Sequence, residues 1–502
     1  MRRIVSGALC GVLAAGFGFA VAELLAAATR PQAGPLVAVG GAIIDATPTP
    51  VKEFAVRELG TNDKPVLLGS IGLVLVLFTV VVGGLAVRHR SVAVAGALAF
   101  GAAGVSAALS RPSAAAVDVV PSMLGAAIAG VILLWLLHRL APTARPRPAE
   151  RDLPEFDRRR FLLAAGLVAA GGVVAGGGAQ VVKRSRGGAV ARSRSSIRLP
   201  AAADPVPPLP AGVGAGFVTD NRDFYRVDTA LTVPRIDVAT WSLRIHGMVE
   251  QATELSFADL LNRPLIERII TLNCVSNEVG GPYIGTAKWL GVPLAPLLKE
   301  LGMEGGADQI VARSVDGMTI GTPVGDSRDA ILCVGMNGEP LTLEHGFPVR
   351  MLTPGLYGYA GACKWLTELE PTTFDAFDAY WVKRGWGRRG LVKTASRIDK
   401  PQPFARLSTG AVTVAGVAWA QERGIRSVEV RADDGPWATA ELLPAPSTNT
   451  WVQWRYSWNA AKGPHTLAVR STDAAGVVQT SQRVTPFPDG ATGWHTITVT
   501  VG

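Results

Sequence analysis

Five long apolar runs near the start of the chain constrain its fold more than any other feature. They cover residues 4–28, 66–87, 91–110, 119–137 and 161–182, and only the first contains a charged residue, Glu23. A helix needs ~20 apolar residues to cross a hydrocarbon core of ~30 Å. Lipid leaves backbone polar groups no other partner, so each run is expected to be a helix. We therefore predict a five-helix transmembrane region over residues 1–182.

Basic residues beside these runs predict the orientation. Short loops on the cytoplasmic side of a membrane are enriched in lysine and arginine. Three alternate flanks carry most of the positive charge, which places the N-terminus inside and everything after residue 182 outside. Lys183, Arg184 and Arg186 oppose this orientation. The basic flanks contain Arg2, Arg3, Arg88, His89, Arg90, Arg139, Arg145, Arg147, Arg151 and Arg158 to Arg160.

The fifth run is preceded by Arg158-Arg159-Arg160-Phe161-Leu162. This looks like a twin-arginine export motif placed internally, before the most glycine-rich and least hydropathic of the five runs. A plain basic flank of a transmembrane helix explains the same residues equally well, and both interpretations stay open.

Overall composition excludes several classes of protein. The chain is 48% hydrophobic and carries a net charge of +9, but its arginines lie beside apolar runs. Membrane topology therefore explains the charge, and no nucleic-acid partner is expected. Cys10, Cys274, Cys333 and Cys363 show no paired spacing, which argues against a disulfide framework or a structural zinc site.

Composition changes twice after the fifth run. Residues 183–215 are rich in Arg, Ser, Gly and Pro and are predicted to be a linker. Residues 216–400 have the composition of a soluble globular domain. Beyond 401, apolar residues alternate with polar ones, as in the stretches 452–458 and 495–501. That period of two predicts strands, and we expect a β-sandwich over 401–502.

Three motifs in the globular part carry candidate chemistry. They are "FYRVD" at 224–228, "TLNCVSNEVGG" at 271–281, and "EHGFPVRMLTPGLYGYAGACKWL" at 344–366. Taken alone, each has a simpler explanation. Cys274 can be a buried core cysteine, Arg226 a surface arginine, and His345 a structural histidine.

Together, in this order, the motifs resemble the sulfite oxidase family of molybdopterin enzymes, over residues 216–502. The resemblance implies that Cys274 ligates molybdenum, with Asn277 in the family's C-x-x-N setting. A thiolate is a soft, strongly donating ligand for a metal that changes oxidation state. The resemblance also implies a set of residues that contact the molybdenum–molybdopterin cofactor: Tyr225, Arg226, Asp316, His345, Arg350, Ala362, Cys363 and Lys364.

Some of these assignments have competing interpretations. Asp316 precedes a glycine and can be an ordinary turn residue. Cys363 is expected to contact the cofactor through its backbone while its side chain packs in the core. Arginine suits a phosphate because its planar guanidinium offers paired donors.

The chain departs from sulfite oxidases at positions that bear on the substrate. Glu278 and Val279 follow the ligand cysteine where animal and plant sulfite oxidases carry basic residues. Trp386 stands where the family has a tyrosine near the metal. Arg423 matches a basic residue that the dimerisation domain offers to the substrate, although it can equally be an exposed strand-end arginine.

The sequence therefore predicts a membrane-anchored molybdopterin oxidoreductase with Cys274, Arg226, Arg423 and Trp386 at its catalytic centre. It would transfer an oxygen atom and two electrons to or from a small oxide or sulfur compound outside the cytoplasm. Sulfoxide reduction and sulfite oxidation are the alternatives within the family, and a non-catalytic membrane-bound binding or sensor protein is the alternative of another class. No haem domain is evident, so a separate cytochrome or a quinone is the expected electron partner. The resemblance also implies a mixed α/β (α+β) cofactor domain over residues 216–400 and an immunoglobulin-like form for the sandwich over 401–502. Homodimer formation is implied by the resemblance alone.

Overall fold

The computed structural model describes residues 2–59, 62–111, 114–140 and 158–502. The basic residues Arg145, Arg147 and Arg151, which entered the orientation argument, lie outside these residues. The chain forms two compact units. The first contains Met1–Arg192 and Thr229–Arg235, and the second contains Ser193–Asp228 and Ile236–Gly502.

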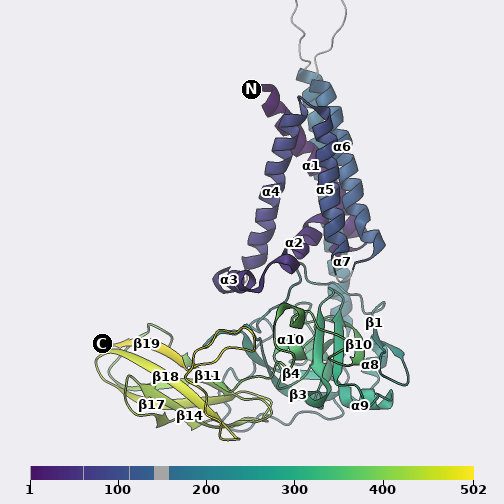
Figure 1. Cartoon of the computed structure of the whole chain (residues 1–502). Coiled ribbons are helices and arrows are strands. Elements are labelled where there is room, and N and C mark those ends of the chain that lie inside the picture. Colours follow the sequence, from purple (N-terminus) through teal and green to yellow (C-terminus); the bar gives the residue numbers. More distant parts are fainter. Residues whose placement is uncertain (1, 60–61, 112–113, 141–157) are drawn as a thin grey trace, which may run out of the picture. The chain divides into compact units, whose positions relative to one another are not determined.

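The first unit is helical, and the five long apolar helices predicted from the sequence are present (Figure 1). Two further helices, α2 and α3, lie in the connection between the first two spans, where the sequence analysis predicted none. The helices are α1 (Arg2–Ala28), α2 (Pro35–Ala46), α3 (Thr49–Leu59), α4 (Asp63–Ala86), α5 (Arg90–Leu109), α6 (Val120–Leu140) and α7 (Arg158–Ser196).

Glycines allow these helices to approach closely. A Cβ added to Gly83 of α4 would lie 2.3 Å from the carbonyl oxygen of Gly7 and 2.8 Å from the Cα of Gly11, both in α1. A Cβ at Gly18 of α1 would lie 2.3 Å from the carbonyl oxygen of Gly125 in α6. Small residues at such crossings are typical of membrane helices, whose association depends on close van der Waals packing.

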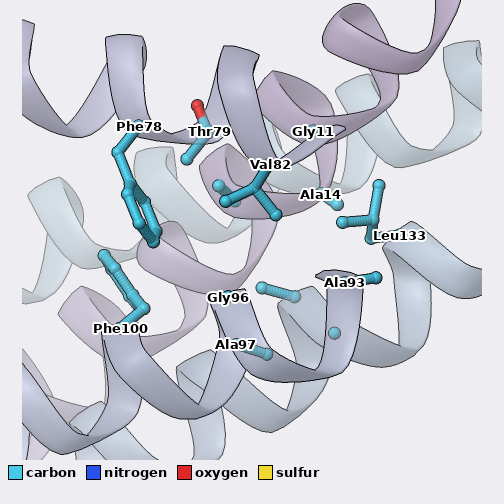
Figure 2. Close-up of a pocket in the computed structure, with 13 residues that line it drawn as sticks. Gly11, Ala14, Phe78, Thr79, Val82, Ala93, Gly96, Ala97, Phe100 and Leu133 are labelled. Atoms are coloured by element: carbon cyan, nitrogen blue, oxygen red, sulfur yellow. The ribbon is translucent and has the colours of Figure 1, made fainter. Parts of the chain in front are cut away.

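A cavity of about 40 Å³ lies among α1, α4, α5 and α6 (Figure 2). The rings of Phe78 and Phe100 and several small residues line it. Thr79 has the only hydroxyl among these lining residues, and it donates to the carbonyl oxygen of Val76 at 2.9 Å. The described lining therefore offers apolar contact alone.

Residues 183–196, which the sequence analysis assigned to a linker over 183–215, belong to helix α7. The helix continues without a break to Ser196, and regular structure ends only there. Two interactions with α1 accompany this extension. Lys183 forms an ion pair with Glu23, Nζ to Oε2 at 2.7 Å. Arg186 donates to the carbonyl oxygens of Ala28 and Thr29 at the end of α1.

These two interactions give Lys183 and Arg186 partners close to the fifth span. The carbonyl end of a helix carries partial negative charge, which favours a cation such as Arg186. Lys183 is compensated by Glu23. Both residues have local partners, so their charge is a weak guide to which side of a membrane they occupy.

The second unit begins with a β-rich domain in which two sheets enclose one main core (Figure 1). Its helices α8, α9 and α10 have only 5, 7 and 4 residues. The domain is thus more β-rich than the α/β prediction suggested. One sheet has the order β2-β1-β10-β5-β6, and the other has the order β3-β4-β7-β8, with β9 pairing β7.

The elements of this domain are β1 (Ser242–Ile245), β2 (Thr253–Ser256), α8 (Phe257–Leu261), β3 (Ile266–Asn273), β4 (Ile284–Pro293), α9 (Leu294–Glu300), β5 (Gln309–Ser314), β6 (Thr319–Pro323), β7 (Ile331–Met336), β8 (Glu339–Pro340), β9 (Arg350–Leu352), α10 (Gly358–Gly361) and β10 (Leu366–Thr372).

The remaining strands form two further sheets, of orders β11-β13-β17-β16 and β12-β19-β18-β14-β15. Residues of both sheets share one core, which includes Trp454 of β17 and Val469 of β18, so the sheets pack face to face as a sandwich. The strands are β11 (Ala395–Lys400), β12 (Arg406–Leu407), β13 (Gly410–Trp419), β14 (Ile425–Ala432), β15 (Ala438–Thr439), β16 (Glu441–Leu442), β17 (Val452–Ala460), β18 (Gly463–Asp473) and β19 (His495–Val501).

Candidate active site

Cys274 begins the loop that joins β3 to β4. The loop is closed at its base by a hydrogen bond from the Cys274 N–H to the carbonyl oxygen of Tyr283, at 3.0 Å. Asn277 is buried and stabilises the loop through two hydrogen bonds. Its Oδ1 accepts the Tyr283 N–H at 2.9 Å, and its own N–H donates to the Cys274 carbonyl at 3.1 Å. Asn277 therefore shapes the loop that presents the thiol.

The Cys274 thiol lies in a polar, largely desolvated environment. Its Sγ is 2.9 Å from the Oγ of Ser276. Burial raises the pKa of the thiol, while the Ser276 hydroxyl and the positive charge of Lys364 act in the opposite direction. Burial raises the pKa of Tyr225 well above its ordinary value and that of Tyr357 to about 12, and a thiolate at Cys274 would raise both further. Both phenols are therefore neutral near pH 7.

The motif "FYRVD" brings a shared carboxylate to this region. Asp228 accepts from Arg226 Nε at 2.8 Å and from Lys364 Nζ at 2.6 Å. Burial lowers the pKa of Lys364 to about 8, although Asp228 opposes that shift. A lysine this deeply buried needs a counter-ion, and Asp228 supplies it for two cations at once.

The motif around "EHGFPVR" places two further nitrogen-bearing side chains in the interior. Arg350 is only 3% exposed, and the one hydrogen bond of its side chain among the described residues runs from Nη1 to the carbonyl oxygen of His345, at 3.2 Å. Its Nε has no partner there. His345 Nε2 lies 3.0 Å from the carbonyl oxygen of Asn221. Burial and the nearby Arg350 lower the pKa of His345 to about 4, so the ring is neutral.

Aromatic contacts connect these groups. The ring of Phe224 lies 5.3 Å from that of Tyr225 and 5.4 Å from that of His345, between centroids. Tyr225 is also influenced by the charges of both Cys274 and Arg350. The three motifs that are separated in sequence therefore meet at one site.

Three other candidate residues lie in the turns beside this site. Asp316 closes a turn by accepting the Met318 N–H at 3.2 Å, and its charge reaches Cys363. Cys363 is fully buried in the main core of the domain. Ala362, which follows α10, is also buried. The side chain of Cys363 is thus in a packing position.

Trp386 and Arg423 are each held by contacts with residues outside the three motifs. Trp386 is buried among aromatic rings and stacks edge-on against Phe487 at 5.3 Å, and its Nε1 has no partner among the described residues. Arg423 is held by Asp473, at 3.2 Å, and donates to the carbonyl oxygen of Val392, at 2.9 Å. The position of Arg423 is therefore fixed by structural contacts.

Sequence reasoning missed several residues of the site. Ser276 and Tyr357 lie inside the quoted motifs, yet neither was singled out, because only contacts across the fold bring Tyr357 near Cys274. Asp228 ends "FYRVD", where it reads as an ordinary acidic residue. Asn273, directly before Cys274, is 3% exposed and its Oδ1 lacks a partner among the described residues.

These unpartnered groups test whether the site fits a molybdenum–molybdopterin cofactor. Burying a guanidinium N–H and an amide oxygen without partners is costly. The Nε of Arg350 and the Oδ1 of Asn273 could each therefore take a hydrogen-bond partner from a polar ligand. A phosphate accepts from arginine and lysine, and a pterin offers both donors and acceptors. The donor set fits the cofactor: Lys364 and Arg350 suit its phosphate, and Cys274 suits the metal.

Comparison with known protein families gives a match to the oxidoreductase molybdopterin-binding domain over residues 230–381. An uncharacterized oxidoreductase of Bacillus subtilis (strain 168), YuiH, is 31% identical over 156 residues, which is 31% of this chain and 76% of that protein. Mitochondrial sulfite oxidase of Mus musculus is 29% identical over 297 residues, 50% of this chain and 53% of that protein.

The chain thus spans about half the length of the curated sulfite oxidases that it matches. Among solved structures, the sulfane dehydrogenase SoxCD of Paracoccus pantotrophus is similar, with a TM-score of 0.50 and 22% identity. That likeness covers 57% of this chain and 82% of the other, and it shows a shared fold.

Proposed function

Because the chain belongs to the sulfite oxidase family of molybdopterin-dependent oxidoreductases, we propose that it carries out two-electron oxygen-atom transfer on a small oxide or sulfur compound. The observation that carries this proposal is the convergence of Cys274, Arg350 and Lys364 on one buried polar site. The cofactor, when bound, supplies a metal that exchanges electrons and an oxygen atom with a substrate.

The residues of the chain have distinct roles in this proposal. Cys274 holds the metal as a thiolate. Arg350 and Lys364 bind the phosphate of the cofactor, and Asp228 keeps Lys364 in place at 2.6 Å. The neutral ring of His345 is fixed by its contact with the Asn221 carbonyl and suits hydrogen bonding to the pterin.

A neutral oxide, such as a sulfoxide, is the substrate class that the charges favour. Arg226 and Lys364 share Asp228, and Arg423 is paired with Asp473. Asp228 and Asp473 therefore offset two of these three positive charges. A small anion such as sulfite gains less from compensated cations, and Glu278 follows the cysteine closely. The phenol of Tyr357 accepts from the Lys393 N–H at 3.4 Å, which leaves its O–H to donate to an oxide.

We also propose the setting of the enzyme. The basic loops favour an N-terminus in the cytoplasm and a catalytic domain, residues 216–400, on the outer face of the cell membrane. A separate cytochrome or a membrane quinone would exchange electrons with it. The sandwich over 401–502 is proposed to be immunoglobulin-like and to mediate dimerisation.

Elemental analysis tests the central claim. The full chain, purified in detergent from a host that makes the cofactor, should contain stoichiometric molybdenum, and molybdenum-free protein would refute the proposal. Cys274→Ser should abolish turnover while the melting temperature changes little, since serine replaces the sulfur with a poor ligand for a soft site.

Substrate preference is tested by comparing sulfite with dimethyl sulfoxide, using artificial electron carriers of suitable potential. The compensated cations predict a kcat/KM for the sulfoxide that exceeds the value for sulfite by roughly tenfold or more. A preference for sulfite would leave the enzyme class intact and reject the neutral substrate.

A further inference from the structure

The strand that leads to Cys274 is held from outside its own domain. Thr271, three residues before the cysteine, makes three hydrogen bonds to the C-terminal sandwich and its loops. Its N–H donates to the carbonyl oxygen of Asn449 at 3.0 Å, and its Oγ1 accepts the Trp451 N–H at 2.7 Å. Its carbonyl oxygen accepts from Gln421 Nε2 at 3.1 Å.

The far end of the same segment is held by two residues of the sandwich. Arg397, in β11, donates from Nη1 to the carbonyl oxygen of Gly281 at 2.8 Å. Asp399 fixes the guanidinium by accepting from its Nε at 2.6 Å. The ring of His495, at the start of β19, lies against Gly280, where an added Cβ would come within 2.2 Å of its Cδ2.

His495 is itself fixed in orientation. Its Nδ1 accepts the Ile398 N–H at 3.0 Å, so the proton of the neutral ring is on Nε2, the nitrogen nearest Gly280. Burial and the charges of Arg397 and Arg483 lower the pKa of His495 to about 4, which keeps the ring neutral near pH 7. The ring therefore acts as a rigid surface for the turn.

Gly280 can lie so close to this ring because it has no side chain and adopts a φ of +81°. Within the loop, a further bond runs from the Gly281 N–H to the Glu278 carbonyl at 2.8 Å. Glu278, Val279 and Gly280 are only half-buried. Internal bonds thus shape the loop, whereas the contacts to Thr271 and to Gly280–Gly281 tie it to the rest of the fold.

We propose that the C-terminal sandwich positions Cys274 by holding its segment at both ends, with Arg397 and His495 as the positioning residues at the second end. This rests on the ligand role of Cys274 in the proposed function. A ligand must be held to within a fraction of an ångström by surrounding contacts. The sandwich is then part of the catalytic site, whatever its role in dimerisation.

The reactivity of the Cys274 thiol offers a readout that needs no cofactor. Cys10, Cys333 and Cys363 are 0% exposed, and Cys274 is the one half-buried cysteine. In cofactor-free full-length protein, the rate of alkylation by iodoacetamide therefore reports how accessible the loop leaves the Cys274 thiol. Mass spectrometry assigns the labelled cysteine, and hydrogen exchange over residues 274–283 reports the opening of the loop independently.

Arg397 is tested with a conservative rescue and a matched control. Arg397→Gln should speed alkylation of Cys274 by roughly fivefold or more, and Arg397→Lys, which can still donate to Gly281, should restore most of the protection. Arg455→Gln is the control, because Arg455 lies in the same sheet and pairs with Glu441 at an exposed position. It should leave the rate unchanged.

His495 is tested through the glycine that it covers. Gly280→Ala should open the loop through two effects, the strained positive φ and the collision with His495. Gly338→Ala controls for the first effect, since Gly338 has a φ of +83° and open space around it. His495→Ala combined with Gly280→Ala should recover part of the protection that Gly280→Ala alone loses.

Unchanged alkylation and hydrogen exchange in both Arg397→Gln and His495→Ala would overturn the proposal. Equal losses of protection from alkylation in Arg397→Gln and Arg455→Gln would overturn the proposal too, because the effect would then not be specific to Arg397. If Arg397→Gln fails to fold, the proposal is tested instead by comparing the rate of Cys274 alkylation in Gly280→Ala with that in Gly338→Ala. A lack of molybdenum in the wild type would refute the proposed function, whereas the thiol measurements would still test whether the sandwich positions Cys274.

Discussion

Asp228 is the residue on which the electrostatics of the site depend most directly. Its carboxylate is shared by Arg226 and Lys364, and the side chains of Asp228 and Lys364 are 5% and 12% exposed. We predict that Asp228→Asn lowers the free energy of unfolding by about 3 kcal/mol, because it leaves two cations without their common counter-ion. Chemical denaturation followed by tryptophan fluorescence measures this.

Asp378→Asn is the matched control for that substitution. Asp378 also pairs with an arginine, Arg388, but both side chains are about half exposed. Solvent screens such a pair, so we expect a loss of less than about 1 kcal/mol. Equal losses for the two variants would contradict the view that Asp228 acts through a desolvated charge cluster.

His345 predicts a pH dependence of stability. Its folded pKa of about 4 lies below its ordinary value of 6.5, through burial first and then through Arg350 and Lys364, while the Asn221 carbonyl and Glu344 oppose the shift. As the pH falls below 6.5, His345 becomes protonated in the unfolded chain but stays neutral in the folded protein. Stability should therefore fall by roughly 3 kcal/mol between about pH 6.5 and pH 4.

The comparison of wild type with His345→Gln isolates this contribution. The variant should show a shallower loss of melting temperature over that pH range, since glutamine does not titrate. Parallel curves for the two proteins would show that His345 does not remain neutral in the fold.

At the residue scale, sequence alone could suggest the identity of the site and little of its geometry. Cys274, Arg350 and Lys364 stood out because of their motifs. Asp228 and Tyr357 did not, because their importance comes from burial and from partners 136 and 83 residues away in the chain. Distances of that kind are set by the tertiary fold, which a local motif does not encode.

At the scale of elements, the close contact between α1 and α4 depends on glycine. Gly83→Leu should push the helices apart, because even a Cβ there would lie 2.3 Å from the Gly7 carbonyl. We expect the melting temperature of the bundle, in detergent, to fall by roughly 5 °C or more. Gly16→Leu is the control, since Gly16 of α1 has nothing within 4 Å. Equal shifts for both would reject specific packing at Gly83.

Long apolar runs and strict alternation predicted elements well. The five apolar helices and the strands over 452–458 and 495–501 follow directly from periods that the sequence repeats. Helices α2 and α3 and the extension of α7 to Ser196 were missed. Their sequences combine moderate helix formers with glycine or charge, so propensity alone does not predict them. The extension of α7 is also accompanied by a tertiary contact, the ion pair of Lys183 with Glu23.

At the scale of the whole molecule, the basic loops predict a definite topology. A reporter that is active only outside the cytoplasm should work when fused after Gly502 and fail when fused before α1, and a cytoplasmic reporter should show the reverse. Replacing arginines in the loop between α6 and α7 with glutamate provides the control, because this change should lower the fraction of correctly oriented chains. An active external reporter at the N-terminus would refute the predicted topology.

Because the sandwich contacts the Cys274 segment at both ends, the order in which the chain is synthesised matters. His495 follows Cys274 by 221 residues. At ~5–20 residues per second, a ribosome needs on the order of 10–40 s to add them. During that interval the cysteine loop exists without the ring that covers Gly280. A cofactor that requires the finished loop must therefore be inserted after translation, into a chain whose later half has already folded.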